Sequence, residues 1–185
     1  MGLASDLRVF IDPDYEDFEG FPTDPASVAE KWGGAFTAAF TETLTPSAAA
    51  GLVFAGGSAL ITQSLTAGLA AGGKLPEEID KALKSAVDKI AQDSAAASAV
   101  APANQFNSEI EVFKGLDPEV QSIAARGGDS IAKQIADFAE ARFGSWIVTG
   151  TFTAFPPPPP AGAGLPLTPW GASPPPPEED EEEDE

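Results

Sequence analysis

Carboxylates are the only abundant side chains in this sequence that commonly take part in catalysis. The chain has 29 Asp and Glu residues but no histidine and no cysteine. It therefore lacks the commonest general base, the usual nitrogen ligand of zinc, and any thiolate or disulfide. Many of the carboxylates gather in residues 12–17 and 178–185, which we expect to be solvated. We therefore expect no enzymatic activity, no catalytic residues and no cofactor.

Two patterns were considered as ligand sites. Alternate acids at Asp12, Asp14 and Glu16 resemble the start of a site for a hard cation such as Ca²⁺. They lack the rest of a calcium loop, which needs a glycine for its turn and a terminal bidentate Glu, so we predict no metal site. The glycine pairs at 33–34, 56–57, 72–73 and 127–128 do not follow the order strand, glycine loop, helix that binds phosphate. We interpret them as helix kinks and helix ends.

The charge balance argues against two kinds of partner. The net charge is −19, and the ten Lys and Arg residues form no basic stripe that would follow a phosphate backbone. The same charge repels anionic membrane surfaces, and no apolar run reaches the roughly 18 residues of a spanning helix. The N-terminal region also lacks the features of a secretory signal. We therefore expect no direct nucleic-acid binding and no membrane insertion, and a location in the cytoplasm or in a particle assembled there.

The first predicted helix begins at Asp24 and carries a long apolar stripe. Asp24 offers an N-cap oxygen, and Pro25 suits the first helical position. A spacing of four residues drifts only about 40° per step around a helix, so side chains at this spacing share one face. We expect that face to be buried, and Gly33 and Gly34 within it suggest that another backbone passes close by. The stripe consists of Val28, Trp32, Phe36, Phe40 and Leu44.

Cap and proline signals predict three more helices. The second should begin at Thr45-Pro46 and end at Gly72-Gly73. The third should begin at Pro76 and fade in the alanine and serine run 94–99, with Ile79, Leu83, Val87 and Ile90 as its buried stripe. After a connector over 102–116, the fourth should begin at Asp117-Pro118 and continue to Phe143, with a kink or break at Gly127-Gly128.

A β-strand is predicted after the fourth helix. Residues 146–155 are rich in β-branched and aromatic side chains, and threonines at 149, 151 and 153 alternate with other residues. A single strand leaves backbone hydrogen-bonding groups unpaired. We expect it to pair in an oligomer, with another chain, or with the N-terminal segment.

The sequence divides into three segments. Residues 1–22 alternate large apolar groups with acids without a persistent period, and we interpret them as an extended, acidic and aromatic N-terminal arm that packs on its own domain or on a partner. Residues 23–155 form a helical domain that ends in the strand. Residues 156–185 form a proline-rich tail with eight terminal acids, which suits a solubilising role, contact with a basic partner, or mimicry of nucleic acid. The fold class is mainly α, with about four helices, one C-terminal β-strand and an extended proline-rich acidic tail.

One pattern of aromatic residues extends over residues 25 to 170. It begins with Trp32, Phe36 and Phe40, continues through an alanine-rich middle, and ends with the motif W-x-x-T-G-T at 146–151 and with Pro169-Trp170. In this order of features the chain resembles small structural proteins of tailed bacteriophages. The resemblance implies a tail, baseplate, neck or capsid-surface component that acts by protein packing and has no catalytic residues. The connector at 102–116 and the tail depart from the pattern, which leaves the position in the particle open.

The resemblance implies other virion structural proteins as partners. A homo-oligomer is expected because the single strand and the alanine-rich, glycine-broken second helix present surfaces that one monomer would struggle to cover. The implied location is the virion, assembled in the host cytoplasm. Seven residues are the candidate protein-interaction residues: Trp32, Phe36, Phe40, Trp146, Val148, Phe152 and Trp170.

Two alternatives remain. The first is a cytoplasmic adaptor or regulatory protein whose tail binds a basic partner or one that reads polyproline. The second is a secreted helical effector, because Trp32-Gly33-Gly34 is similar to the W-x-G motif of small helical-hairpin proteins. In that family the motif lies in the turn between two helices, whereas here it falls within an amphipathic stripe.

Overall fold

The structure is a computed structural model that describes residues 2–48, 52–97, 130–148, 150–153 and 167–169. These residues form a mainly helical protein with five helices, which are α1 (Leu3–Ile11), α2 (Pro25–Ala48), α3 (Ala55–Ala70), α4 (Leu75–Ala97) and α6 (Ile131–Ile147). The predicted connector at 102–116, the helix start at 117–118 and the glycine pair at 127–128 lie outside the described residues. None of the helices in the described ranges combines the length and apolar character needed to cross a membrane.

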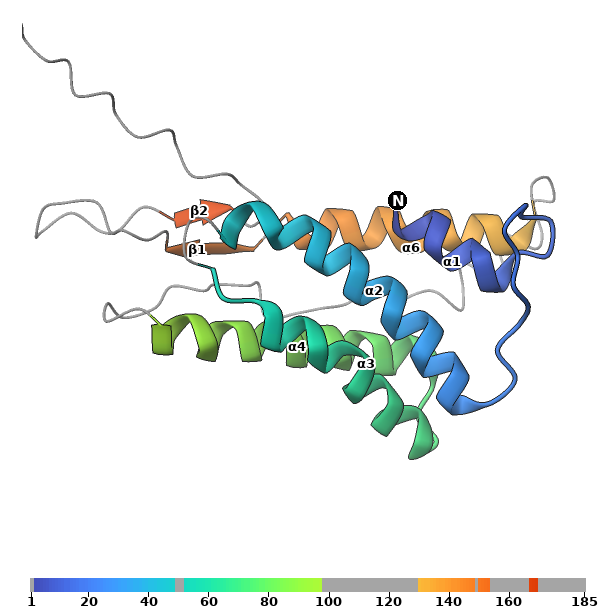
Figure 1. Cartoon of the computed structure of the whole chain (residues 1–185), viewed down its shortest axis with the longest axis horizontal. Coiled ribbons are helices and arrows are strands. Elements are labelled where there is room, and N and C mark those ends of the chain that lie inside the picture. The colour runs from blue at the N-terminus through green and yellow to red at the C-terminus, as the bar shows by residue number, and fades with distance from the viewer. Residues whose placement is uncertain (1, 49–51, 98–129, 149, 154–166, 170–185) are drawn as a thin grey trace, which may run out of the picture.

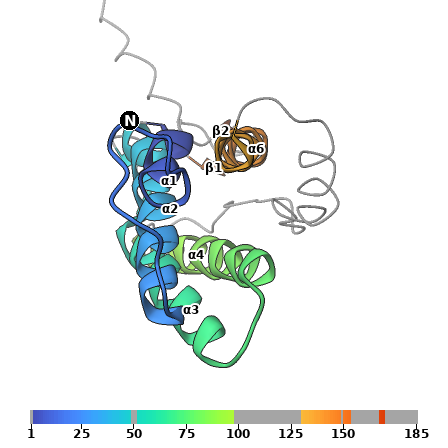
Figure 2. The same ribbon diagram turned by 90° about the vertical axis from the view of Figure 1, so that its right-hand side faces the viewer.

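The long helix α2 occupies the centre of the arrangement. It contacts α1 on one side and α3 on the other, while α3 packs against α4 and α1 packs against α6. Figure 1 shows α1 and α6 along one side of α2, with α3 and α4 on the opposite side, and the end view in Figure 2 shows the same two pairs. The buried core extends through both pairs, so α2 is the element that the two halves share.

The start and the buried face of α2 agree with the prediction. The side-chain Oδ1 of Asp24 accepts hydrogen bonds from the backbone N–H groups of Ala26 at 2.9 Å and Ser27 at 3.0 Å, as an N-cap should. Of the predicted stripe, Trp32, Phe36, Phe40 and Leu44 are buried and Val28 is partly buried.

The end of α2 corrects the predicted boundary between the first two helices. A new helix does not begin at Thr45-Pro46, because α2 continues to Ala48 with Pro46 inside its last turn. The Thr45 hydroxyl donates to the carbonyl of Thr41 at 2.7 Å and so bonds backward instead of capping a following helix. The next helix, α3, begins at Ala55.

Helices α3 and α4 follow the predicted pattern more closely. After α3 ends, Gly72 adopts a φ of +86°, a left-handed conformation that glycine reaches without strain. The predicted stripe of α4 is buried, from Ile79 to Ile90. The two helices approach closely at Gly57, where an added Cβ would lie 2.5 Å from the backbone oxygen of Ala86.

The N-terminal segment differs from the predicted extended arm. Residues Leu3–Ile11 form helix α1, and Leu3, Leu7 and Phe10 are buried on one helical face. The helix ends before Pro13, since the residue preceding a proline favours extended backbone; Asp12 has φ −116° and ψ 99°. The helical spacing of Leu3, Leu7 and Phe10 is short and is followed directly by a run of acids, so the sequence analysis did not identify it. The sequence analysis left open whether this segment packs on its own domain or on a partner; α1 packs against α2 and α6 of the same chain.

The predicted strand is shorter and starts later. Trp146 and Ile147 belong to α6, because they continue the buried face that includes Ala136, Ala139 and Phe143. Strand β1 (Thr151–Thr153) pairs antiparallel with β2 (Leu167–Pro169) of the same chain, with Phe152 opposite Thr168. The strand therefore has a partner within its own chain, in a segment that the sequence analysis assigned to the tail.

Candidate functional site

The structure places the seven candidate interaction residues in different environments. Trp32, Phe36, Phe40 and Trp146 are buried in the core of the chain itself, so they do not form an exposed docking surface. Val148 is 65% exposed at the end of α6. Phe152 belongs to β1, and Trp170 lies outside the described residues.

The buried aromatic side chains join α2 to α6. Phe36 contacts Phe143 edge to face with ring centroids 5.7 Å apart, and Phe40 stacks on Trp146 at 6.2 Å. Phe143 and Trp146 also contact each other at 5.8 Å. Such pairs add about 0.5–1.5 kcal/mol each beyond the area that they bury. The aromatic pattern that the sequence shows is therefore used, in the described residues, for packing within the chain.

A buried carboxylate joins α1 to α6. Asp12 is fully buried, and its Oδ2 accepts a hydrogen bond from Nε of Arg8 at 2.8 Å. Its Oδ1 accepts hydrogen bonds from the hydroxyl of Ser130 at 3.0 Å and from the backbone N–H of Asp14 at 3.3 Å. Ser130 is in turn the N-cap of α6 and accepts from the backbone N–H of Lys133 at 3.0 Å. We call Arg8, Asp12 and Ser130 the Asp12 clasp.

The hydrogen bonds of the clasp control the ionisation of Asp12. Burial by itself would raise the pKa of Asp12, because it disfavours the charged carboxylate. The hydrogen bonds from Arg8, Ser130 and the backbone of Asp14, together with the charge of Arg8, outweigh burial and lower the pKa below its ordinary value. The ionised carboxylate is therefore part of the folded structure.

The clasp also occupies the oxygens of Asp12, which was considered with Asp14 and Glu16 as a calcium site. Both oxygens of Asp12 accept hydrogen bonds within the chain, and Asp14 and Glu16 are exposed. Among the residues that the structure describes, no group of three or more acidic side chains is placed to hold a metal ion. Of these acids, Asp12 is therefore buried and structural, whereas Asp14 and Glu16 are exposed, and the three do not form a metal centre.

Comparison with known proteins adds no assignment of residues. The chain matches no protein-family model, no curated protein and no solved structure. The candidate site below follows from the geometry and charges of the described residues.

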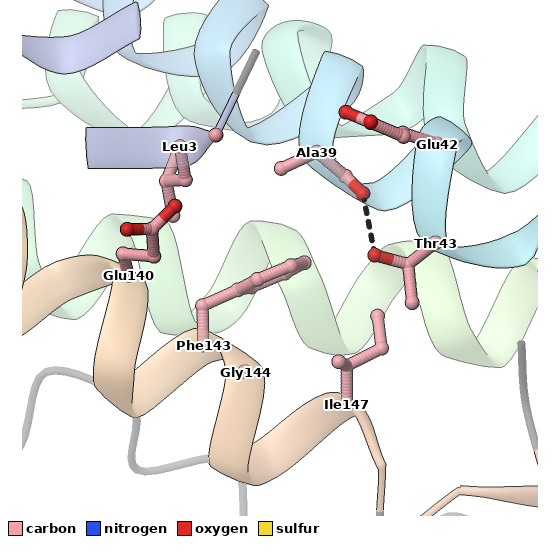
Figure 3. A pocket seen from close by; sticks show the side chains of 9 residues that line it. Leu3, Ala39, Glu42, Thr43, Glu140, Phe143, Gly144 and Ile147 are labelled. Atoms are coloured by element: carbon pink, nitrogen blue, oxygen red, sulfur yellow. Dashed lines mark hydrogen bonds between the residues drawn. The ribbon is translucent and has the colours of Figure 1, made fainter. Parts of the chain in front are cut away.

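A cleft of about 480 Å³ opens between α1, α2 and α6 (Figure 3). Apolar side chains supply much of its wall, and two carboxylates, Glu42 from α2 and Glu140 from α6, stand at its edge. In Figure 3 the two carboxylates come from opposite walls, and the ring of Phe143 extends from α6 toward α2. The other lining residues are Gly2, Leu3, Ala39, Thr43, Gly144 and Ile147. We call this space the acidic cleft.

The charged side chains that line the acidic cleft are the two carboxylates of Glu42 and Glu140. Glu42 and Glu140 are exposed, and within the described residues neither one forms an ion pair. A third carboxylate, Asp6 on α1, is close enough to be affected by both. Burial raises the pKa of Asp6, the positively charged N-terminal amino group lowers it, and the negative charges of Glu42 and Glu140 raise it; the net shift is upward. Asp6 itself lines the neighbouring cleft between α1 and α2, so the acidic cleft contains two carboxylates, one from α2 and one from α6.

Sequence reasoning did not find the acidic cleft. Its walls come from residues near positions 3, 42 and 143, and no local pattern relates these positions. Phe143 was identified as an apolar residue of the last helix, whereas Glu42 and Glu140 look like ordinary solvated acids. Glu140 lies one turn before the buried Phe143, which is common on amphipathic helices, but Glu42 has no aromatic residue one turn away, so the two acids share no signal in the sequence.

Proposed function

We propose that the chain is a structural or assembly protein of tailed-bacteriophage particles. In this proposal it carries out no catalysis and acts by packing against other virion proteins and further copies of itself, after synthesis in the host cytoplasm. The support from sequence is the aromatic pattern over residues 25 to 170 that resembles small phage structural proteins. This support concerns the class of protein and leaves its place in the particle open.

One structural observation supports association with other proteins. The strands β1 and β2 have three residues each, and no third strand adds to them in the described part of the chain. Isolated two-stranded sheets are marginally stable in water, and open strand edges readily accept another strand. Val148, which is 65% exposed, precedes β1 in the chain and offers an exposed apolar side chain.

The proposal predicts that the protein is present in several copies in purified phage particles. Mass spectrometry of gradient-purified virions tests this directly, with abundance measured relative to the major capsid protein. Absence from particles while the protein is abundant in the lysate would overturn the proposal and favour the adaptor alternative. The secreted-effector alternative gains no support from the fold, because Trp32, Gly33 and Gly34 lie inside α2 and not in a turn.

A pair of variants tests the surface at the end of α6. Val148→Asn should weaken self-association about tenfold, because burying a valine side chain is worth about 1.5 kcal/mol. Ile131→Asn is the matched control, since Ile131 is 47% exposed at the opposite end of the same helix. Sedimentation equilibrium measures the association, and both variants should unfold within about 0.5 kcal/mol of the parent. Equal loss in the two variants would contradict a specific contact at Val148.

A further inference from the structure

We infer that a surface at the start of α2 joins two copies of the chain, with Phe21 of each copy inserted into an apolar cleft of the other. The inference rests on the proposed function, in which the chain packs against further copies of itself, and it names a surface for that contact. We call Phe21, together with the cleft between the start of α2 and the end of α3, the Phe21 surface.

Phe21 is an aromatic side chain held in solvent. Four large apolar side chains are exposed among the described residues, and Phe21, at 60%, is the aromatic one. Its ring contacts that of Phe18 edge to face, with centroids 5.0 Å apart. The backbone N–H of Glu19 donates to the carbonyl of Val9 at 2.7 Å, and Gly20 turns the chain with a φ of +114°. The ring therefore lies on an anchored segment, which limits the entropy lost when a partner covers it.

The cleft beside Phe21 offers an apolar lining that is accessible from outside. It has a volume of about 330 Å³, which exceeds that of a phenylalanine side chain. Pro22, Pro25, Val28 and Leu69 supply apolar atoms to its lining. Pro25 is exposed and the other three are partly buried, so each has surface left for contact with a partner. An aromatic ring in this cleft removes apolar area of both molecules from water.

The position of the ring next to the cleft identifies a second copy as the occupant. In a dimer with two-fold symmetry both subunits use the same surface patch, so that patch must contain a feature and its complement. The Phe21 surface contains both, because Phe21 is followed directly by Pro22 of the cleft lining. A two-fold axis between ring and cleft places each ring at the cleft of the other copy.

The charges near the Phe21 surface favour contact between two acidic chains. Lys31 pairs with Glu19 at 2.5 Å, and Lys74 pairs with Glu77 at 4.0 Å. The carboxylate of Asp24, which belongs to the cleft lining, caps α2. The net charge of −19 opposes contact between copies, and these lysines reduce that repulsion beside the cleft.

The Phe21 surface is separate from the contact proposed at Val148. In Figure 1 the start of α2 and the end of α3 lie toward the right, whereas β1 and β2 lie at the left. A chain with one self-association surface at each end can bind a copy at both, and several copies can then be joined.

Two complementary variants test the exchange between copies. Phe21→Ser removes the ring and keeps the cleft, whereas Leu69→Gln makes the cleft lining polar and keeps the ring. Each variant alone should self-associate at least about tenfold more weakly, because neither of its two ring-to-cleft contacts is intact. An equimolar mixture regains one contact and should associate about tenfold more tightly than either variant alone. Sedimentation equilibrium measures all three, and every chain carries Val148→Asn so that only the Phe21 surface is compared.

The matched control is Ile131→Ser in the same background. It removes an exposed apolar side chain at the start of α6, away from the Phe21 surface, and should change the association less than about twofold. Thermal unfolding of each variant checks that it remains folded. As an independent measurement, the backbone ¹⁵N resonances of Leu69 and Gly73 should move with concentration in the Val148→Asn chain and stay fixed in the chain that also carries Phe21→Ser.

Three outcomes would overturn the Phe21 surface. These are equal losses from Phe21→Ser and Ile131→Ser, a mixture of folded variants that associates no more tightly than its components, or a Val148→Asn chain that is monomeric at all accessible concentrations. The result is distinguishable from failure of the proposed function. Complementation in a protein that is absent from virions would retain the surface and remove the phage assignment, whereas a virion protein without complementation would lose only the surface.

Discussion

Asp12 shows how a single residue can connect distant parts of the chain. Its partner Ser130 is 118 positions away in sequence, and the hydrogen bond between them joins the end of α1 to the start of α6. Because Asp12 is buried and ionised, its hydrogen bonds are charge-assisted and stronger than those between neutral groups. The carboxylate oxygens that were considered for a cation site therefore stabilise the contact between two helices.

The clasp predicts a specific loss of stability. Asp12→Asn should reduce the free energy of unfolding by about 1.5–3 kcal/mol at neutral pH, because it replaces charge-assisted hydrogen bonds with weaker ones and leaves Arg8 without its partner. Asp14→Asn is the control, since the Asp14 side chain is exposed and only its backbone contacts the clasp. Urea unfolding measures both. Losses of the same size in both variants would show that the clasp contributes little.

The effect of Asp12 should depend on pH with a defined sign. Its pKa in the folded protein lies below the ordinary value of 3.8, so the stabilisation is fully present above pH 3.8. It is lost as the pH falls through the folded pKa, where the carboxylate becomes protonated in both states. The stability difference between the parent and Asp12→Asn should therefore shrink below pH 3.8. A difference that stays constant in acid would contradict the ionised clasp.

At the scale of helices, small residues determine how closely α2 and α3 approach. A Cβ added at Gly33 would lie 2.8 Å from Cα of Thr62, whereas a Cβ added at Gly34 meets nothing within 4 Å. Nearby, the Thr37 hydroxyl donates to the backbone oxygen of Ser58 at 3.3 Å. The glycine pair that the sequence analysis related to a passing backbone thus has one member at the crossing and one that faces open space.

This difference predicts opposite effects for the same substitution at adjacent positions. Gly33→Ala should destabilise the protein by about 1–3 kcal/mol, because its methyl group would push the α3 backbone away. Gly34→Ala should stabilise it by up to about 1 kcal/mol, since alanine favours the helix and the site has room. Thermal unfolding under identical conditions compares the two. Destabilisation by both variants would mean that α2 and α3 do not cross as described.

At the scale of the whole molecule, the core and the acidic terminus differ in composition. The core is formed by apolar residues of α1, α2, α3, α4 and α6, together with Leu52 before α3. Residues 171–185 contain no apolar side chain larger than proline, and eight of them are consecutive acids. Such a composition does not provide the apolar surface that folding requires.

Removal of residues 171–185 should therefore leave the melting temperature nearly unchanged. A fall of more than roughly 5 °C, which corresponds to about 1 kcal/mol or more in a domain of this size, would show that the terminus stabilises the body. Differential scanning calorimetry of the full chain and of the shortened chain makes the comparison.

Features that depend on neighbouring residues could be predicted from the sequence. The Asp24 cap, the stripe from Trp32 to Leu44 and the stripe of α4 were predictable, because a helix repeats every 3.6 residues and its cap is made by local side chains. The glycine stop after α3 was predictable for the same reason.

The other features depend on contacts between residues that are far apart in the chain. Pro46 remains inside α2, and Trp146 and Ile147 belong to α6 and not to a strand, because burial of their neighbours outweighs local propensity. The helical form of residues 3–11 depends on packing against α2 and α6, since so short a helix is marginal when isolated. The Asp12 clasp and the acidic cleft combine side chains that are far apart in sequence, and such pairings carry no local signal from which they could be predicted.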